Sequence, residues 1–489
     1  LAAELPYFQQ LQDSLNRFVR AHPHPESVGQ PNIRLTIDRP LHSNVNRIFL
    51  NAVRTFNATR SPFADIQQQP ASVCIMNALN GDVLAMPSYP APADVQTLRE
   101  RAQTGSLRGV TDAKLRRLSQ NQNLMLGPIG STTKPLFASA VWDTRPDLMG
   151  LIVDEPAGGR RDLLGYHLTA AFGTKGPRTL DSTGFLLRSS NDYTLHLGLL
   201  ILAKDVRIGA GGKPVFPEGK ADLSAYFRGD AIPGGLNRPD VPAFPKMSEC
   251  YDVGLVQKLT DGPAGQWDIG ILAPMLRQIG VEETAMAAPA LDEKRDSETA
   301  QIRDVVFNQF SGVLPERANL QLDTISSVRG RYTSMLLGSG TNYWSNLKLA
   351  EAYCRLGTGR MVRARLTADP EHEVKFEDIP KLPLQDKTLA AVHKGMSQCA
   401  EGAPNSTTGA EFGSAIRKAR THFAAKGLKF FAICKTGTAT RISEKKENGQ
   451  VVEPLRECAA FCLYLEVQDQ SGNPVAALSS ATYLQDRGS

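Results

Sequence analysis

Residues 127–143 read GPIGSTTKPLFASAVWD, a glycine-containing turn that runs into an apolar pattern of helical spacing. Ser131 or Thr132 can cap a helix beginning here, and Pro135 fits its first turn, where a missing N–H leaves no bond unmade. Residues three apart share a helix face, so Lys134 can reach back to the Ser131 hydroxyl. The positive end of the helix favours negative charge developing there. The stretch therefore predicts an activated serine nucleophile.

The Ser-x-x-Lys pattern is weak support when it is taken alone, because the chain contains two more copies. Ser345 to Lys348 fits a helix cap followed by a solvated lysine, and Ser443 to Lys446 falls in a polar turn. Assigning the chemistry to Ser131 needs corroboration from other segments.

Two further short motifs follow in the chain. RSSNDY at 188–193 contains Ser189 and Asn191 ahead of an apolar helical pattern. CKTGTA at 434–439 contains Lys435 and its neighbours on a predicted strand. Each motif has a plain alternative, because Ser-Ser-Asn can merely cap a helix and Lys-Thr-Gly-Thr can be an ordinary strand end.

The ordered set Ser-x-x-Lys, Ser-x-Asn and Lys-Thr-Gly is much more specific, and with it the chain resembles the transpeptidase domain of penicillin-binding proteins. The forms of the second and third motifs look more like those of the monofunctional, class B enzymes than those of the bifunctional ones. The resemblance extends over about 31–485, with 204–330 unmatched. It is also carried by LTID at 35–38, GDVLAMPSYP at 81–90, SGTNYWSNLKLAEAYCRLGTG at 339–359 and KGMSQCAEGAP at 394–404.

The fold expected from the residues and from this resemblance is mixed α/β (α+β), like that of penicillin-binding proteins and serine β-lactamases, with a mainly antiparallel sheet flanked by helices. Strands are predicted early and late in the chain and helices between them, so the two chain ends should meet in one sheet. Residues 1–30 are expected to be a linker or truncated N-terminal region and 31–489 the transpeptidase domain, with a family-atypical insertion at about 204–330. The predicted strands are 32–38, 71–89, 428–442, 457–467 and 474–485, and the predicted helices are 131–142, 181–203, 346–359 and 387–400.

The resemblance implies that Ser131 attacks the carbonyl of a D-alanyl-D-alanine stem peptide while Lys134 takes the hydroxyl proton. Ser189 would relay a proton to the leaving amine, and Asn191 would hold the lysine and the substrate amide. Backbone N–H groups of Ser131 and Thr438 would form the oxyanion hole.

The third motif is expected to bind the substrate. Lys435, Thr436 and Thr438 would supply a cation and hydroxyls for the terminal carboxylate. Gly437 would let the peptide lie along the strand edge as an added strand.

Composition and charge exclude other classes. Lys plus Arg total 55 against 50 Asp plus Glu, giving a net charge of +5 without a long basic run, so nucleic-acid binding is not expected. No apolar stretch approaches the length of a membrane span.

The seven cysteines contain no CxxC pair and the histidines no HExxH, so no metal is expected, and no cofactor either. Cys434 and Cys462 lie on neighbouring predicted strands and can be cross-linked or stay buried thiols.

Two alternative functions remain open, a D,D-carboxypeptidase and a non-catalytic scaffold, whereas a β-lactamase is not expected. A D,D-carboxypeptidase shares the acyl-enzyme and differs only in whether water or an amine attacks it. A class A β-lactamase needs a glutamate in a Glu-x-x-x-Asn setting soon after the second motif, and none stands there. A non-catalytic scaffold would retain the fold without the reaction, although the three motifs are intact.

The expected ligands are stem peptides and β-lactams, with wall-synthesis proteins as further partners. The domain is expected in the periplasm or at the outer face of the cytoplasmic membrane, tethered by a segment outside this sequence, which begins at Leu1.

Overall fold

The computed structural model describes most of the chain outside its N-terminus and a long central stretch. The described residues are 34–58, 70–104, 115, 118, 121–123, 126–157, 177–201, 203, 205–226, 336–338, 343–368, 373–404, 406–442, 445–447, 450–453 and 456–488. The expected linker at 1–30 and most of the expected insertion at 204–330 lie outside them, so the domain division stays a prediction.

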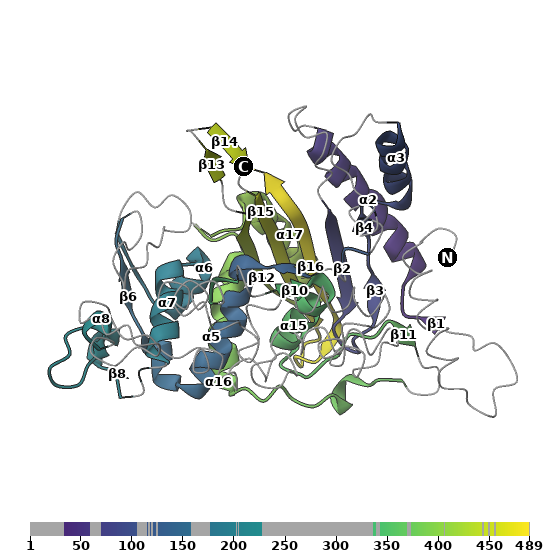
Figure 1. Cartoon of the computed structure of the whole chain (residues 1–489). Coiled ribbons are helices and arrows are strands. Elements are labelled where there is room, and N and C mark those ends of the chain that lie inside the picture. Colours follow the sequence, from purple (N-terminus) through teal and green to yellow (C-terminus); the bar gives the residue numbers. More distant parts are fainter. Residues whose placement is uncertain are drawn as a thin grey trace, which may run out of the picture.

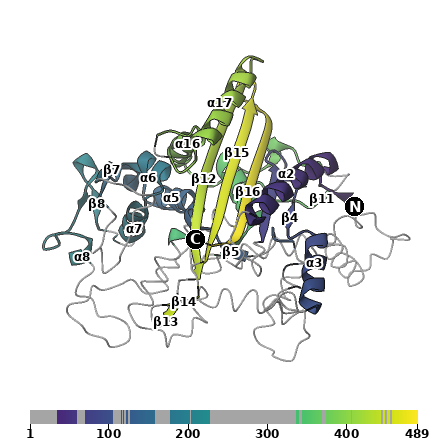
Figure 2. The ribbon, with the colours of Figure 1, turned by 90° about the horizontal axis from the view of Figure 1, so that it is seen from above.

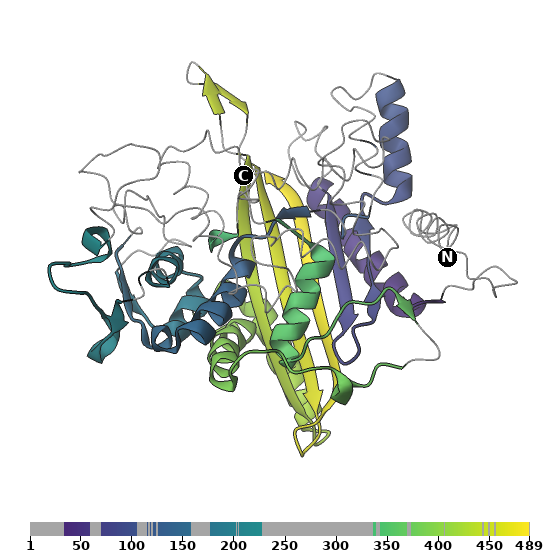
Figure 3. The ribbon, with the colours of Figure 1, turned by 60° about the horizontal axis from the view of Figure 1, so that its bottom comes forward.

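An antiparallel sheet built from both ends of the chain forms the centre of the fold (Figure 1; Figure 3). The C-terminal strand pairs with the first strand of the N-terminal hairpin, with Ala481 opposite Cys74, so the prediction that the chain ends meet in one sheet is confirmed. In spatial order the strands are β12 (Lys429–Ile442), β15 (Arg456–Gln468), β16 (Pro474–Gly488), β2 (Ala71–Asn77) and β3 (Val83–Ala85), with β4 (Ser88–Tyr89) also paired to β2.

Helices cover both faces of the sheet, because side chains on both faces of its strands are apolar. Along β15 the side chains alternate between buried and half-buried, as a strand covered on two sides requires. α15 (Asn346–Thr358) packs on one face, whereas α17 (Ala410–Ala424) and α2 (Arg39–Ala58) lie on the other (Figure 2). Beside the β12 edge stand α5 (Thr133–Thr144), α6 (Ser182–Arg188), α7 (Asn191–Leu200) and α16 (Asp386–Ala400).

Shorter elements complete the described part. Two-stranded pairs are formed by β1 (Arg34–Leu35) with β11 (Thr367–Ala368), β5 (Leu126–Pro128) with β10 (Tyr343–Ser345), β6 (Val153–Glu155) with β7 (Arg178–Leu180), β8 (Arg207–Ile208) with β9 (Pro214–Val215), and β13 (Lys445–Glu447) with β14 (Gln450–Glu453). The remaining helices are α3 (Pro92–Gln103), α8 (Leu223–Tyr226) and the 3₁₀ turns η2 (Gly130–Thr132), η3 (Pro146–Gly150), η4 (Ala210–Gly212) and η8 (Phe376–Asp378). In the described ranges, none of the helices has the length and hydropathy needed to cross a bilayer.

The predicted fold class is confirmed, and some of the predicted elements differ from those observed. The expected strand at 32–38 is reduced to β1 and followed by α2, which was not predicted. The helical pattern at 181–203 is two helices, α6 and α7, broken at Ser189. Residues 71–89 form the predicted strands, with Gly81 at a φ of 84° in the turn. The glycine stop after 346–358 is Gly359, at a φ of 65°.

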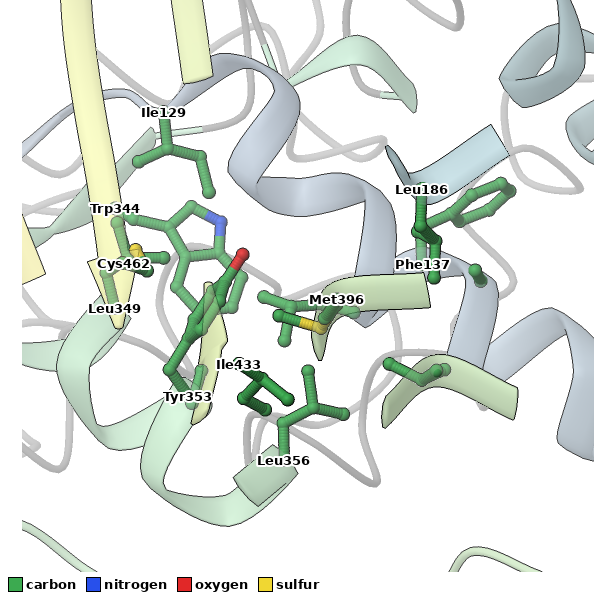
Figure 4. Close-up of a cluster of buried hydrophobic side chains, with 14 of the residues drawn as sticks. Ile129, Phe137, Leu186, Trp344, Leu349, Tyr353, Leu356, Met396, Ile433 and Cys462 are labelled. Carbon is green, nitrogen blue, oxygen red and sulfur yellow. The ribbon is translucent and has the colours of Figure 1, made fainter. Parts of the chain in front are cut away.

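The main hydrophobic core lies between α15, α16 and the face of the sheet on which α15 packs. It extends to η2, the turn that carries Ser131. Figure 4 shows Trp344, Tyr353 and Ile129 converging there with side chains of α5 and α16. The Tyr353 hydroxyl donates a hydrogen bond of 2.8 Å to the Thr132 carbonyl. Core packing therefore fixes the backbone of the turn that carries Ser131.

The six described cysteines form no disulfide and are buried, as expected for small apolar side chains. In the register, Cys462 lies opposite Lys435, whereas Cys434 lies opposite Leu463. Their side chains therefore point to opposite faces of the sheet, and the cross-link left open between Cys434 and Cys462 is not formed.

Candidate active site

The turn that carries Ser131 abuts the third motif on β12. Gly130 has a φ of 58°, and a Cβ placed on it would lie 2.7 Å from the Thr438 nitrogen. A Cβ on Gly437 would lie 2.9 Å from the Thr132 nitrogen. Real Cβ atoms do not approach that closely, so only glycine at both positions lets the two backbones touch.

Ser131 itself lies in η2, immediately before α5, and its side chain is half-buried. The predicted side-chain cap of this helix is wrong, because the Thr132 hydroxyl donates to the Ile129 carbonyl at 2.8 Å instead. Within the part of the chain that the structure describes, no hydrogen bond joins the Ser131 hydroxyl to Lys134.

The second motif lies in the break between α6 and α7. Ser189 ends α6 in the left-handed conformation, with φ 57° and ψ 42°, as the only described residue other than glycine with a positive φ. Ser190 caps α7 by accepting a hydrogen bond from the Tyr193 N–H at 3.0 Å. Because Ser190 caps α7, the Ser189 hydroxyl is not needed as a helix cap and can bind groups of the candidate site. Strained backbone of this kind tends to occur at functional sites.

Two lysines from different elements converge on Ser189. Lys134 Nζ donates to the Ser189 carbonyl at 2.6 Å and to Asn191 Oδ1 at 2.7 Å, and it lies 3.4 Å from Ser189 Oγ. Lys435 Nζ donates to Ser189 Oγ at 2.8 Å and to the Thr436 carbonyl at 3.0 Å. The structure thus joins all three motifs through one serine hydroxyl.

Both amines are buried, which changes their acidity. Burial, the charge of Lys435 and that of Arg178 hold the pKa of Lys134 well below its usual value, against an opposing effect of Glu155. Burial lowers the pKa of Lys435 to about 8. A lysine that is easily deprotonated can accept a proton from a neighbouring hydroxyl, which is the role expected of Lys134.

The third motif lies on an edge strand of the sheet. β12 pairs with β15 and is the last strand of the described sheet. The Thr436 hydroxyl donates to Thr407 Oγ1 at 2.6 Å, and Thr438 is exposed. This edge has the form that binds an extended peptide by adding a strand.

Three residues of the site were missed by the sequence analysis. Thr407 comes from the loop after α16, and Glu155 and Arg178 face each other across β6 and β7. Arg178 Nε donates to Glu155 Oε2 at 2.6 Å. No motif marks any of the three, because they reach the site only through the fold.

The two other Ser-x-x-Lys copies are structural where they are described. Ser345 caps α15 by accepting from the Lys348 N–H at 3.1 Å, as predicted. Lys348 is buried against Glu351, so the expected solvated lysine is wrong. Lys446 lies in β13, and Ser443 lies outside the described residues. Among the residues described, no group of His, Cys, Asp and Glu could hold a metal ion.

Comparison with known proteins shows the fold. No family model and no curated protein matches the chain. Penicillin-binding protein 2 of Pseudomonas aeruginosa, in complex with WCK 5153, is 17% identical over 96% of this chain and 76% of that one, with a TM-score of 0.50. A peptidoglycan synthase complex that coordinates polymerization and crosslinking is 16% identical over 93% of this chain and 59% of that one, with a TM-score of 0.50. The TP domain of Burkholderia pseudomallei penicillin-binding protein 3 is 13% identical over 94% and 90%, with a TM-score of 0.45.

The mixed α/β fold with its antiparallel sheet between helices is that of penicillin-binding-protein transpeptidase structures. At these identities the likeness extends to the fold alone.

Proposed function

We propose that the chain is a serine D,D-transpeptidase, a monofunctional, class B-like penicillin-binding protein that cross-links peptidoglycan stem peptides. The observation that carries the proposal is the Ser189 hydroxyl, which accepts a 2.8 Å hydrogen bond from Lys435 and lies 3.4 Å from the Lys134 amine, three residues after Ser131. In the proposed complex, the Ser131 hydroxyl, the two lysine amines and the edge of β12 surround the carbonyl of the bound peptide.

In the proposed acylation, Ser131 Oγ forms a bond to the carbonyl carbon of the penultimate D-alanine and gives its proton to Lys134. The peptide bond to the terminal D-alanine breaks, and its nitrogen receives a proton through Ser189. An amine of a second stem peptide then attacks the acyl carbonyl and forms the new peptide bond. The ester bond to Ser131 Oγ breaks, and that oxygen recovers a proton from the amine through Lys134. With a β-lactam, the bond that breaks is the ring amide, so the leaving nitrogen stays attached and the adduct persists.

The third motif is proposed to hold the substrate. Lys435 is positively charged at pH values below its pKa of about 8 and attracts the terminal carboxylate. The hydroxyls of Thr436 and Thr438 lie on the same strand. The N–H groups of Ser131 and Thr438 are the proposed oxyanion hole, which the backbone contact between Gly130 and Thr438 supports. A peptide that carries D-alanine at its end is the proposed ligand.

This reaction defines where the domain is proposed to act. Its substrate lies outside the cytoplasmic membrane, so we place the domain in the periplasm or at the outer face, with wall-synthesis proteins as partners and a tether outside the sequence. Residues 31–489 are proposed to be one transpeptidase domain.

A fluorescent penicillin and stem-peptide substrates test the proposal together. We expect one covalent adduct on the native protein, a mass increase equal to the penicillin, and an adduct peptide that contains Ser131. Cross-linked muropeptide together with free D-alanine would identify a transpeptidase, whereas hydrolysed product alone would identify a D,D-carboxypeptidase. A native chain that forms no adduct would be a scaffold, and the proposal would fail.

Substitutions of Ser189 separate its catalytic role from its backbone strain. We expect Ser189→Ala and Ser189→Gly both to slow acylation by penicillin by about 10²- to 10⁴-fold, because both lose the hydroxyl that relays the proton. The two variants should differ in stability, since glycine relieves about 1 kcal/mol of left-handed strain that alanine retains.

Stopped-flow acylation and urea unfolding measure the two effects. Ser190→Ala is the matched control, because it removes the cap of α7 at a cost of about 1 kcal/mol and leaves the Ser189 hydroxyl in place. Acylation by Ser189→Gly at the native rate would remove Ser189 from the mechanism.

A further inference from the structure

The strongest unexplained feature near the site is a buried ion pair on the small hairpin β6–β7. Glu155 is 1% exposed, and Arg178 Nε donates to its Oε2 at 2.6 Å. The second oxygen, Glu155 Oε1, is buried and has no hydrogen-bond partner, and the same holds for Arg178 Nη2. A buried pair with unmade hydrogen bonds costs stability, so packing alone gives no reason for it.

The hairpin is held against the catalytic elements. β6 lies beside α7, which begins at Asn191, the residue that holds Lys134 (Figure 1). The Tyr193 hydroxyl donates to the Leu151 carbonyl at 2.9 Å, which fixes the segment leading into β6. The charges of both Glu155 and Arg178 act on Lys134, in opposite directions.

The charges around Lys134 are unbalanced. Lys435 and Arg178 contribute two cations near Lys134, and Glu155 contributes one carboxylate. If Glu155 were absent, the two neighbouring cations would disfavour the ammonium form of Lys134 more strongly. If Arg178 were absent, the Glu155 carboxylate would favour that ammonium form more strongly. The two members of the pair therefore act against each other at the amine that must lose its proton.

Other charged groups on the elements packed against α5 are engaged elsewhere or exposed. Asp192 of α7 pairs with His196 at 3.2 Å, and Asp147 of η3 pairs with Arg145 at 2.7 Å. His393 of α16 bonds the Leu356 carbonyl at 2.7 Å. The remaining charged side chains of α16 are exposed, namely Asp386, Lys387 and Lys394.

We propose that Glu155 and Arg178 are positioning residues that set the protonation of Lys134, with Glu155 favouring the ammonium and Arg178 the neutral amine. This inference rests on the proposed function, because it assigns a role within the same acylation. In this assignment both residues act through Lys134 and not on the substrate. Their ionic contact is oriented by the three-residue strands β6 and β7, where Glu155 lies directly opposite Arg178.

The test is the pH dependence of the second-order rate of penicillin acylation, measured with single substitutions that remove one charge each. Glu155→Gln should move the acid limb of the profile to lower pH, because Lys134 then loses its proton more easily. Arg178→Gln should move that limb to higher pH. Each shift should be about half a pH unit or more, since charges in buried surroundings are weakly screened.

Two further variants separate this role from a structural one. Arg178→Lys keeps both charges and should leave the acid limb in place, and the double variant Glu155→Gln/Arg178→Gln should return it towards the native position. The alkaline limb, assigned to Lys435 with a pKa of about 8, should stay fixed in all of them. A structural role would lower the rate in both single variants without moving the limb in opposite directions.

The outcomes decide this inference separately from the proposed function. If the native protein forms an adduct but Glu155→Gln and Arg178→Gln move the limb in the same direction, or not at all, the inference is wrong and the proposed function stands. The inference is equally wrong if no variant shows an acid limb above about pH 4. If the native protein forms no adduct, the proposed function itself fails.

Discussion

Replacing Ser131 by alanine is expected to abolish the covalent penicillin adduct and to slow D-alanine release by at least about 10³-fold. The side chain is half-buried in η2. Its backbone is fixed on one side by the close contact of Gly130 with Thr438 and on the other by the hydrogen bond from Tyr353 to the Thr132 carbonyl. Alanine fits there without strain, so the fold should remain intact. Intact-protein mass spectrometry after incubation with penicillin measures the adduct, and circular dichroism checks the fold.

The chain contains its own control for this substitution. Ser345 has the same Ser-x-x-Lys spacing, but its hydroxyl caps α15 by accepting from the Lys348 N–H at 3.1 Å. Ser345→Ala should cost about 1 kcal/mol of stability and leave the adduct unchanged. An adduct that survives Ser131→Ala, or that disappears in a folded Ser345→Ala variant, would contradict the assignment of the nucleophile.

The part of the fold that sequence could predict is the part whose pattern is strong and local. Strands 428–442, 457–467 and 474–485 were predicted within a few residues, because apolar side chains fill both faces of a covered sheet. α2 and α17 were not predicted. α17 buries only Gly413 and Ile416, a stripe too narrow to stand out in the sequence.

The site was predictable as a set of motifs but not as a geometry. The sequence indicated that Ser131, Ser189 and Lys435 belong together, and the structure brings their segments into contact. The polar Ser-Ser-Asn stretch allowed a helix to start here, but it could not indicate that the backbone at Ser189 is left-handed and turns towards two amines.

The same limit explains the ion pair near Lys134. Glu155 and Arg178 are 23 residues apart on strands of three residues, too short to carry a readable pattern. Charge partners of a buried amine are set by tertiary packing, which spacing in the sequence does not encode.

Replacing Glu351 by alanine is expected to destabilise the protein by about 3–5 kcal/mol, because removing one partner of a buried ion pair leaves an uncompensated charge. Glu351 lies on α15 between two buried cations, with the Lys348 amine on Oε1 and Arg355 Nη2 at 2.8 Å from the same oxygen. Its other oxygen accepts from the Ala364 N–H at 2.8 Å. The loss should appear as a lower urea midpoint.

The pH dependence of stability should change in the same variant. Burial alone would raise the pKa of Glu351, but the charges of Lys348 and Arg355 and the Ala364 N–H override it and hold the pKa at about 2, below the ordinary 4.5. A depressed carboxylate pKa contributes stability that is complete above about pH 4.5 and is lost as the pH falls towards 2. The difference in the free energy of unfolding between the native protein and Glu351→Ala should therefore become smaller as the pH falls from 4.5 to about 2.

A triple variant distinguishes the charge from the space that it fills. Lys348→Met, Glu351→Leu and Arg355→Met together remove every charge of the cluster at similar volume, which is often neutral or stabilising for a buried network. We expect this variant to recover most of the stability lost in Glu351→Ala, although Arg355 also donates to the Val362 carbonyl at 2.8 Å. A loss below about 1 kcal/mol in Glu351→Ala would mean that water reaches the two cations when the carboxylate is removed, and that the cluster is not sealed by the core around α15.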